Sequence, residues 1–190
     1  MSIATSTTSV VTDLAQGNIT VRSRDGRTYR LRPIRPSDAA SLARGYAAMS
    51  AEAKHHRMLY KVPELTPAMA ASYCSPDPDR DYVVVVEGRD ELDGEILGGA
   101  RLTGLKDGKA AQISVSLRPE AERRGIGKAV LKMLLRVAQE KGVQSVWGII
   151  VTDNKPMMAL ARSLGFSFAA NPEDPSENIV RLDLKDKSFA

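Results

Sequence analysis

The chain is expected to fold as an α/β protein built on one mixed, mostly antiparallel sheet of six to seven strands with helices on both faces. Three observations predict this class. Alternating and β-branched runs recur along the chain, stretches with apolar residues at helical spacing lie between them, and three successive strand-like runs precede the longest helical stretch. Hairpin-linked strands followed by a crossover helix place antiparallel and parallel pairs in the same sheet.

The first two strands are expected at 19–24 and 28–34, because Asp25-Gly26 between them is a strong hairpin-turn signal. Ser37 can then cap the first helix. The remaining expected elements are a short helix within 51–60, a helix that starts at Thr66-Pro67, strands at 82–87, 96–105 and 110–117, a helix at 126–141 ended by Gly142, a strand at 143–151, a helix at 154–164 ended by Gly165, and strands after Phe166 and near 179–184.

Residues 1–18 are expected to form a disordered N-terminal arm, and residues 19–190 a single domain. The arm is rich in serine and threonine, and it lacks the basic segment and the sustained apolar run of a signal peptide. No apolar run approaches the ~18 residues of a membrane span. Cys74 is the one cysteine, so an intrachain disulfide is excluded and a reducing compartment, the cytoplasm, is expected.

The charge balance favours a small anionic ligand over nucleic acid. The 27 Lys and Arg residues exceed the 23 Asp and Glu residues by four, which is a mildly basic balance. Aromatic residues make up 5% of the chain, too few for a base-stacking surface. The expected partners therefore include neither nucleic acid nor a membrane, and either a monomer or a dimer fits the sequence.

The segment from Arg118 to Lys128 is the strongest candidate site. It reads RPEAERRGIGK and connects the strand-like run AQISVSL with the longest helical pattern. A helix N-terminus presents unpaired N–H groups and the positive end of the helix dipole, which suit a phosphate. Gly125 and Gly127 lack a Cβ, so a ligand can approach the main chain, and basic side chains surround the turn. The segment predicts a phosphate or pyrophosphate site.

Two better-known phosphate motifs do not fit this segment. A P-loop needs Ser or Thr after Gly-Lys, where Ala129 stands. A dinucleotide-binding turn needs a third Gly or Ala, where Val130 stands. A glycine-containing turn with solvated charges remains the alternative on this segment alone.

In its wider context the same segment resembles the GNAT superfamily of N-acetyltransferases. That family has a Gln/Arg-x-x-Gly-x-Gly/Ala turn between its fourth strand and its third helix, and residues 122–127 read Glu-Arg-Arg-Gly-Ile-Gly here. The strand-like run VWGIIV, then Asn154, then Leu-Gly-Phe at 164–166 follow the turn. Over about 26–166, the segments LRPIRPSDA, MSAEAKHHRMLY, LTPAMAASY and DNKPMMALARSLGF look most like the acetyltransferase domain of Pat-type protein lysine acetyltransferases.

The resemblance implies acetyl-CoA or another acyl-CoA as co-substrate, an amine as acceptor with a protein lysine as one candidate, and no metal. It also implies that the fourth and fifth strands splay apart, which frees main-chain groups for the pantetheine arm. The Leu117 amide would polarise the thioester carbonyl. The resemblance assigns acyl-CoA binding to Val115, Ser116, Leu117, Arg118, Arg123, Arg124, Gly125, Ile126, Gly127, Lys128, Ala129, Asn154 and Met157. A plain helix cap is the compatible alternative for Asn154.

Three positions depart from the family pattern. Glu122 stands where Gln or Arg is usual, and its carboxylate slightly opposes a phosphate. Gln112 occupies the position where Pat-like relatives place a glutamate general base, and glutamine cannot take a proton near neutral pH. Ala161 stands where many small-molecule relatives have a tyrosine general acid. Either a water chain that ends at another carboxylate takes the proton, or the acceptor amine arrives deprotonated. Asp153, just past the fifth strand, is the first candidate for such a carboxylate, with a turn-forming aspartate as the alternative.

Two other functions fit the same residues. A CoA-binding regulatory module with little catalysis would explain the loss of both proton-transfer positions, and an acetyltransferase for small-molecule amines is the second. The pair His55-His56 has no accompanying metal ligands and predicts solvated or lightly packed side chains. The acidic residues at 173, 174 and 177 predict either a solvated loop or a surface that attracts a cationic acceptor.

Overall fold

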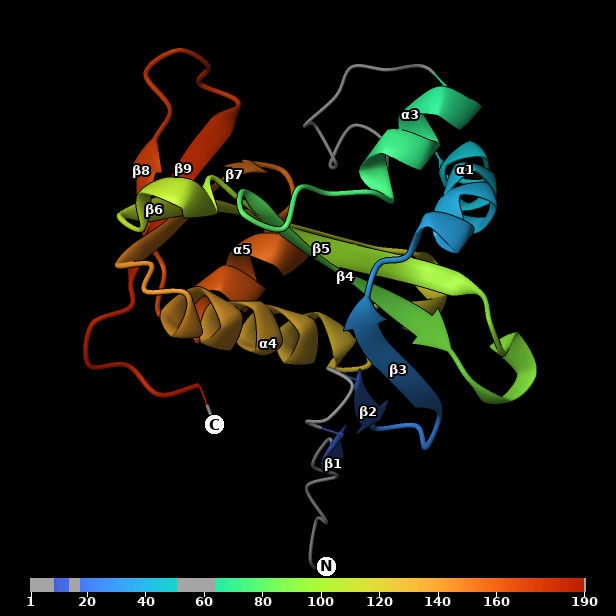
Figure 1. Ribbon diagram of the computed structural model, residues 1–190. Coiled ribbons are helices and arrows are strands. Elements are labelled where there is room, and N and C mark those ends of the chain that lie inside the picture. Colours follow the sequence, from blue (N-terminus) through green and yellow to red (C-terminus); the bar gives the residue numbers. More distant parts are fainter. Residues whose placement is uncertain (1–8, 14–17, 51–63, 190) are drawn as a thin grey trace, which may run out of the picture.

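The computed structural model describes residues 9–13, 18–50 and 64–189, whose strands form one nine-stranded sheet (Figure 1). The strand order is β1-β2-β3-β4-β5-β6-β7-β9-β8. The strands are β1 (Ser9–Asp13), β2 (Asn18–Arg22), β3 (Thr28–Pro33), β4 (Asp81–Gly88), β5 (Ile96–Thr103), β6 (Ala110–Leu117), β7 (Ser145–Val151), β8 (Ser167–Ala170) and β9 (Glu177–Asp183). The helices are α1 (Ala39–Ala47), α3 (Pro67–Tyr73), α4 (Ile126–Glu140) and α5 (Lys155–Ser163), with short 3-10 turns η1 (Pro36–Asp38), η2 (Asp90–Leu92), η3 (Leu105–Asp107) and η4 (Pro119–Ala121).

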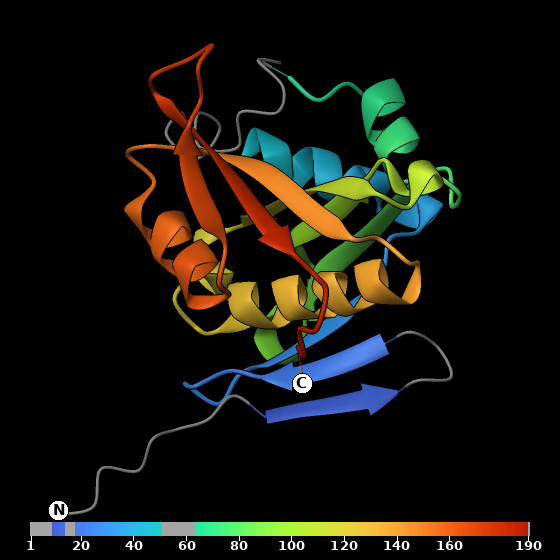
Figure 2. The same cartoon turned by 90° about the vertical axis from the view of Figure 1, so that its left-hand side faces the viewer.

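The predicted fold class is confirmed, because every strand pair is antiparallel except β6 with β7. The predicted number of strands was too low. One reason is β1, which lies inside the segment expected to be a disordered arm and pairs with β2, as the lower part of Figure 2 shows. Val10, Val11 and Thr12 are β-branched and suit a strand, although their Ser/Thr-rich surroundings predicted disorder.

Helices cover both faces of the sheet (Figure 1). α4 and α5 lie on one face, where fully buried α4 side chains such as Leu134 pack against strand residues such as Val84 and Leu102. α1 and α3 lie on the other face and contact each other. α4 ends as predicted, with Gly142 at a φ of +75° just beyond it. No helix in the described part of the chain has the length and apolar character to cross a membrane.

The short helix expected within 51–60, including His55 and His56, lies outside the described residues. Beyond that gap, α3 begins as predicted. The Thr66 hydroxyl accepts a hydrogen bond from the Met69 N–H at 3.3 Å, and Pro67 occupies the first helical position. Tyr73 is the last residue of α3.

A buried charge cluster anchors the start of α1 to the sheet. Arg32 on β3 donates two hydrogen bonds to the Asp38 carboxylate, at 2.8 and 2.9 Å. Its Nε donates a third to Glu87 on β4, at 2.5 Å. The Arg35 main-chain N–H also donates to Asp38, at 2.8 Å. Because Asp38 is the residue before α1, these bonds hold the helix against β3 and β4.

The parallel pair β6–β7 comes apart after three residues. Ala110, Ala111 and Gln112 pair with Ser145, Val146 and Trp147, and no later pair follows. Beyond this point β6 remains paired with β5 as far as Leu117, and β7 remains paired with β9 as far as Val151. The two central strands therefore diverge and leave a gap in the middle of the sheet.

Candidate functional site

A cavity of about 460 Å³ passes through this gap, and residues from both faces of the sheet line it. On the α1 and α3 side, helix residues such as Ser41, Tyr46 and Tyr73 form its wall. On the other side, Asn154 and Met157 close it. The cavity thus connects the two faces of the sheet at the point where β6 and β7 diverge.

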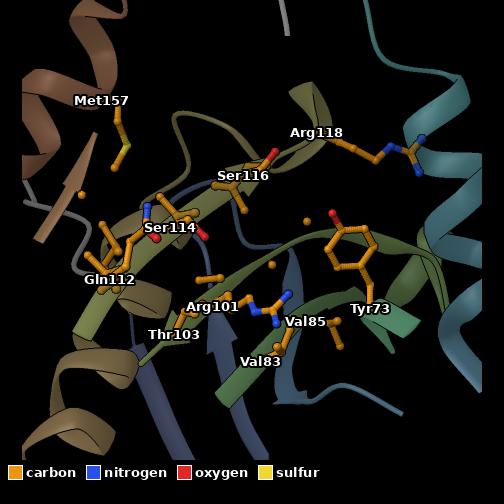
Figure 3. A pocket seen from close by; sticks show the side chains of 18 of the residues that line it. Tyr73, Val83, Val85, Arg101, Thr103, Gln112, Ser114, Ser116, Arg118 and Met157 are labelled. Carbon is orange, nitrogen blue, oxygen red and sulfur yellow. The ribbon is translucent and has the colours of Figure 1, made fainter. Parts of the chain in front are cut away.

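Side chains of β6 line this cavity in two sets. Gln112, Ser114 and Ser116 face the α1 and α3 side, where Figure 3 shows them along one strand. Ile113 is buried in the core on the α4 side, and Val115 and Leu117 pack against that core. This is the alternation predicted for a strand. Gly148 of β7 approaches β6 so closely that an added Cβ would lie 2.8 Å from the Ile113 carbonyl oxygen.

The turn before α4 leaves the helix N-terminus without a side-chain cap. Gly125 is the N-cap residue, with a φ of +87° and no side-chain hydrogen bond to the first turn. Arg123, two residues earlier, also has a positive φ, of +56°. The first N–H groups of a helix have no partner within the helix, so those of α4 can receive an anion.

Gly127 also has a packing role that the sequence did not indicate. A Cβ on this residue would lie 3.2 Å from the Leu160 side chain and 3.4 Å from that of Leu117. Its missing side chain therefore allows α4 to pack closely on β6 and α5. Gly125, by contrast, owes its place to a left-handed backbone that glycine adopts readily.

Two of the predicted phosphate-binding cations have partners in the protein. Arg118 pairs with Glu120 at 2.9 Å and with Glu95 at 3.5 Å, and in Figure 3 its side chain points toward α1. Arg124 forms an ion pair with Asp25 of the β2–β3 turn. Arg123 and Lys128 are exposed beside the α4 N-terminus. The basic side chains therefore surround the turn, but the uncapped main chain is its most direct anion-binding feature.

Asn154 both caps α5 and lines the cavity. Its Oδ1 accepts a hydrogen bond from the Met157 N–H at 3.1 Å. Both residues also line the cavity, and Figure 3 shows the Met157 side chain directed toward β6. The position of Asn154 is therefore compatible with both alternatives, a helix cap and a residue that borders a bound ligand.

The floor of the cavity on the α1 and α3 side consists of matched residues from three strands. The strand registers place them in three rows across β4, β5 and β6. The rows are Val85, Gly99 and Ser116; Val83, Arg101 and Ser114; and Thr103 and Gln112, whose β4 neighbour Asp81 does not line the cavity. The middle row brings the guanidinium group of Arg101, for which no sequence pattern predicted a role, into the centre of this floor (Figure 3).

Not all of the positions connected with proton transfer lie at the cavity. Gln112 and Ala161 both line the cavity. Asp153 is exposed and is not among the lining residues. Glu177, at the start of β9, lines the cavity while remaining only 7% exposed, and its Oε2 accepts a hydrogen bond from the Asn171 amide at 2.7 Å.

Glu177 was expected only as part of an acidic loop, either solvated or attractive to a cationic acceptor, and not as a buried carboxylate of the cavity. A signal was present, since Glu177 directly precedes the apolar alternation of the last strand. Its register with Val151 places it on the same face as Trp147 and, through the β6–β7 pairing, as Gln112. Among the described residues, no group of three His, Cys, Asp or Glu side chains is arranged to hold a metal ion.

The family model and the relatives that this chain matches agree with one another. Residues 29–167 match the model of the acetyltransferase (GNAT) domain family. A Pseudomonas aeruginosa protein, named as an acetyltransferase, is 24% identical over 160 residues, which cover 84% of this chain and 86% of the relative. The ribosomal protein bS18-alanine N-acetyltransferase of Escherichia coli is 31% identical over 61 residues, which cover 32% of this chain and 41% of that enzyme.

Solved structures show the same fold. The GNAT domain of S. lividans PAT has a TM-score of 0.77 at 21% identity, and the match covers 89% of this chain and 98% of that one. A ribosomal L7/L12 α-N-protein acetyltransferase in complex with coenzyme A has a TM-score of 0.64 at 14% identity, with 82% of this chain and 93% of that one covered. At these identities the likeness concerns the architecture of the chain.

Proposed function

The chain belongs to the GNAT acetyltransferase family, whose members carry out acyl-CoA-dependent N-acetylation. We propose that the acyl donor and the acceptor amine bind in different parts of its cavity. The acyl donor lies in the gap between β6 and β7 with its pyrophosphate at the α4 N-terminus. The acceptor amine enters from the α1 and α3 side. The observation that carries the proposal is the cavity itself, which runs through the sheet beside an uncapped helix N-terminus.

Main-chain groups account for most of the proposed donor contacts. Once β6 leaves β7, the β6 edge at Val115, Ser116 and Leu117 is available to pair with the amides of a pantetheine arm. The N–H groups at the start of α4 receive the pyrophosphate, and Arg123 and Lys128 add positive charge nearby. Asn154 and Met157 border the same arm from α5.

The proposed reaction is direct transfer within a ternary complex. The neutral amine attacks the thioester carbon, the new C–N bond forms, and the C–S bond breaks as coenzyme A leaves as a thiolate. The Leu117 N–H is our candidate donor to the carbonyl oxygen as negative charge develops there. The surplus proton of the amine must go to a base on the acceptor side, since Gln112 cannot take it. Solvent protonates the thiolate, because Ala161 offers no acid.

Glu177 is better placed than Asp153 to accept the proton of the amine. It is a buried carboxylate on the acceptor face of the cavity, whereas Asp153 is exposed outside it. We therefore assign the proton to Glu177, received directly or through one water. Both a protein lysine and a small amine fit this assignment as acceptor.

A CoA-binding module with little catalysis is the second candidate function, favoured by Gln112 and Ala161 at the two proton-transfer positions. An assay of free thiol released from acetyl-CoA separates the candidates. The acceptor panel comprises amino acids, polyamines, aminoglycosides, lysine peptides and acyl-CoA synthetases. Thiol release above the rate without acceptor identifies an enzyme, and its absence with every acceptor supports the binding module.

Gly125→Glu is expected to weaken acetyl-CoA binding about tenfold or more. A carboxylate at the N-cap would occupy the α4 N-terminus and oppose the phosphates. A glutamate would also have to adopt the backbone φ of +87° that Gly125 has, at a cost of roughly 1–2 kcal/mol in folding free energy. Thermal shift with increasing acetyl-CoA measures binding separately from this loss, because each variant is compared with its own ligand-free melting temperature.

Gly142→Glu is the matched control for this experiment. It places the same charge on the same helix, at its opposite end, where φ is +75° and nothing lies within 4 Å of an added Cβ. Its ligand-free stability should fall by a similar amount, while acetyl-CoA should raise its melting temperature as in the wild type. Equal acetyl-CoA affinities of the two variants would refute the donor site proposed at α4.

A further inference from the structure

Arg101 lies in the acceptor half of the cavity without a role in acyl transfer. It projects from the middle of β5, between Val83 on β4 and Ser114 on β6. Its side chain is 27% exposed and lines the cavity, and Figure 3 shows it on the same face as Ser114 and Tyr73. A long cationic side chain in the centre of a cavity floor has a high desolvation cost unless anionic or polar groups compensate it.

The compensation within the described residues is incomplete. Arg101 Nη2 donates to Asp81 Oδ2 at 2.5 Å, and the guanidinium lies 5.9 Å from the centre of the Tyr73 ring. Arg101 Nε is buried and has no hydrogen-bond partner there, and the same is true of Asp81 Oδ1. Asp81 thus fixes one edge of the guanidinium, while donor capacity remains on a group that faces the cavity.

We propose that Arg101 binds a carboxylate of the acceptor, so that the substrate is a small amino acid rather than the side chain of a protein lysine. Arginine presents several N–H donors in one plane and favours carboxylates, with which it forms charge-assisted hydrogen bonds. A bare ammonium group would meet a like charge at this point. This inference rests on the proposed function, since it names the acceptor of that same cavity.

The strand register places the base of the Arg101 side chain next to β6, where the thioester is proposed to lie. Arg101 and Ser114 are direct cross-strand neighbours, and the Cβ atoms of such neighbours are about 4.5–5.5 Å apart. The reacting amine must reach the edge of β6 where the thioester lies. A short separation between amine and carboxylate, as in an α- or β-amino acid, fits this spacing.

The remaining groups on this floor are compatible with such a ligand. Ser114, Ser116 and Thr103 offer hydroxyl groups from the neighbouring rows. Gly99, in the row between Val85 and Ser116, lines the cavity without a side chain. Besides Arg101, the charged residues in the described part of the chain that line the cavity are Arg118 and Glu177. The carboxylate of Glu177 suits the amine end of an amino acid.

The test compares each of the twenty protein L-amino acids with its own α-carboxamide. The full-length protein is first saturated with coenzyme A, and thermal shift then measures amino-acid binding, which needs no turnover. Thiol release from acetyl-CoA gives kcat/KM for the same pairs. We expect at least one amino acid to bind and to be acetylated with a kcat/KM about 10- to 100-fold above that of its carboxamide, the range for a hydrogen bond to a charged group.

Variants show whether Arg101 causes this preference. Arg101→Met should lower kcat/KM for the preferred amino acid about 10- to 100-fold and leave that of the carboxamide within about twofold. Arg101→Lys keeps the charge and should retain part of the preference. Asp81→Asn is the matched control, because it breaks the same ion pair but keeps the guanidinium, so the preference for the carboxylate should persist.

Three outcomes would overturn the inference. Carboxamides could be acetylated as well as the free amino acids, Arg101→Met could affect both equally, or no amino acid could bind the CoA-loaded protein. In each of these cases a normal thermal shift with acetyl-CoA would leave the proposed donor site standing. Absence of any acetyl-CoA response in the wild type would overturn the proposed function itself and this inference with it.

Discussion

Asp38→Asn is expected to lower the free energy of unfolding by about 3 kcal/mol, because it breaks a buried ion pair and leaves a buried charge without its full compensation. Arg32 is 4% exposed and Asp38 6%. Asparagine can accept one of the two hydrogen bonds from Arg32 but cannot balance its charge. Glu87 remains as a partner at 2.5 Å, which places the expected loss at the lower end of the range for broken buried pairs.

The same substitution should change how stability depends on pH. Burial raises the pKa of Asp38, but hydrogen bonds from Arg32 and the Arg35 main chain outweigh it, and the folded pKa lies below its ordinary value. A carboxyl group with a lowered folded pKa stabilises the protein above its unfolded pKa of about 3.9, and this stabilisation disappears as pH falls through the folded pKa. Urea unfolding should show this acid-dependent loss in the wild type and a reduced slope in Asp38→Asn.

Asp93→Asn provides the comparison for this prediction. Asp93 also pairs with an arginine, Arg89, at 2.7 Å, but its side chain is 61% exposed. An exposed pair of this kind contributes about 0–1 kcal/mol. If Asp38→Asn costs no more than Asp93→Asn, the buried cluster does not stabilise the fold as we argue. If Asp38→Asn weakens acceptor binding more than acetyl-CoA binding, the cluster also positions α1 as a wall of the cavity.

Local signals predicted most elements of this fold. The Asp25-Gly26 turn, the Thr66 cap and Gly142 each act on their immediate neighbours, and each lies at the predicted boundary. β1 was missed because its strand character depends on pairing with β2, which a composition of Ser and Thr does not reveal. Non-local pairing, rather than propensity, decides such an edge strand.

The candidate site shows the same division between local and long-range information. The α4 N-terminus was predictable, because strand, glycine turn and helix are consecutive in the chain. Arg101 and Asp81 are 20 residues apart, and only the β4–β5 register brings them together. The divergence of β6 from β7 after Gln112 was expected from the family resemblance alone, since the alternating pattern of β6 and the apolar run of β7 both continue past this point without a break.

Glu177→Gln is expected to lower kcat about 10²-fold, the lower part of the range for general acid–base catalysis, with little change in the KM for acetyl-CoA. Glutamine keeps the shape of the side chain and can still bond to Asn171, but it cannot accept the proton of the attacking amine. The deficit should shrink as pH rises toward the pKa of the acceptor amine, because more of the amine is then already neutral. A purely structural role of Glu177 would not produce this recovery.

Two further variants decide whether the assignment is correct. Asp153→Asn removes the exposed carboxylate that the sequence favoured, and it should change kcat by no more than about twofold, as expected for a group that transfers no proton. Gln112→Glu, added to Glu177→Gln, should restore part of the rate, since it returns a carboxylate to the cavity on the same face. If Asp153→Asn instead costs more than Glu177→Gln, the proton leaves toward the end of β7, and the buried carboxylate of β9 serves only to hold Asn171.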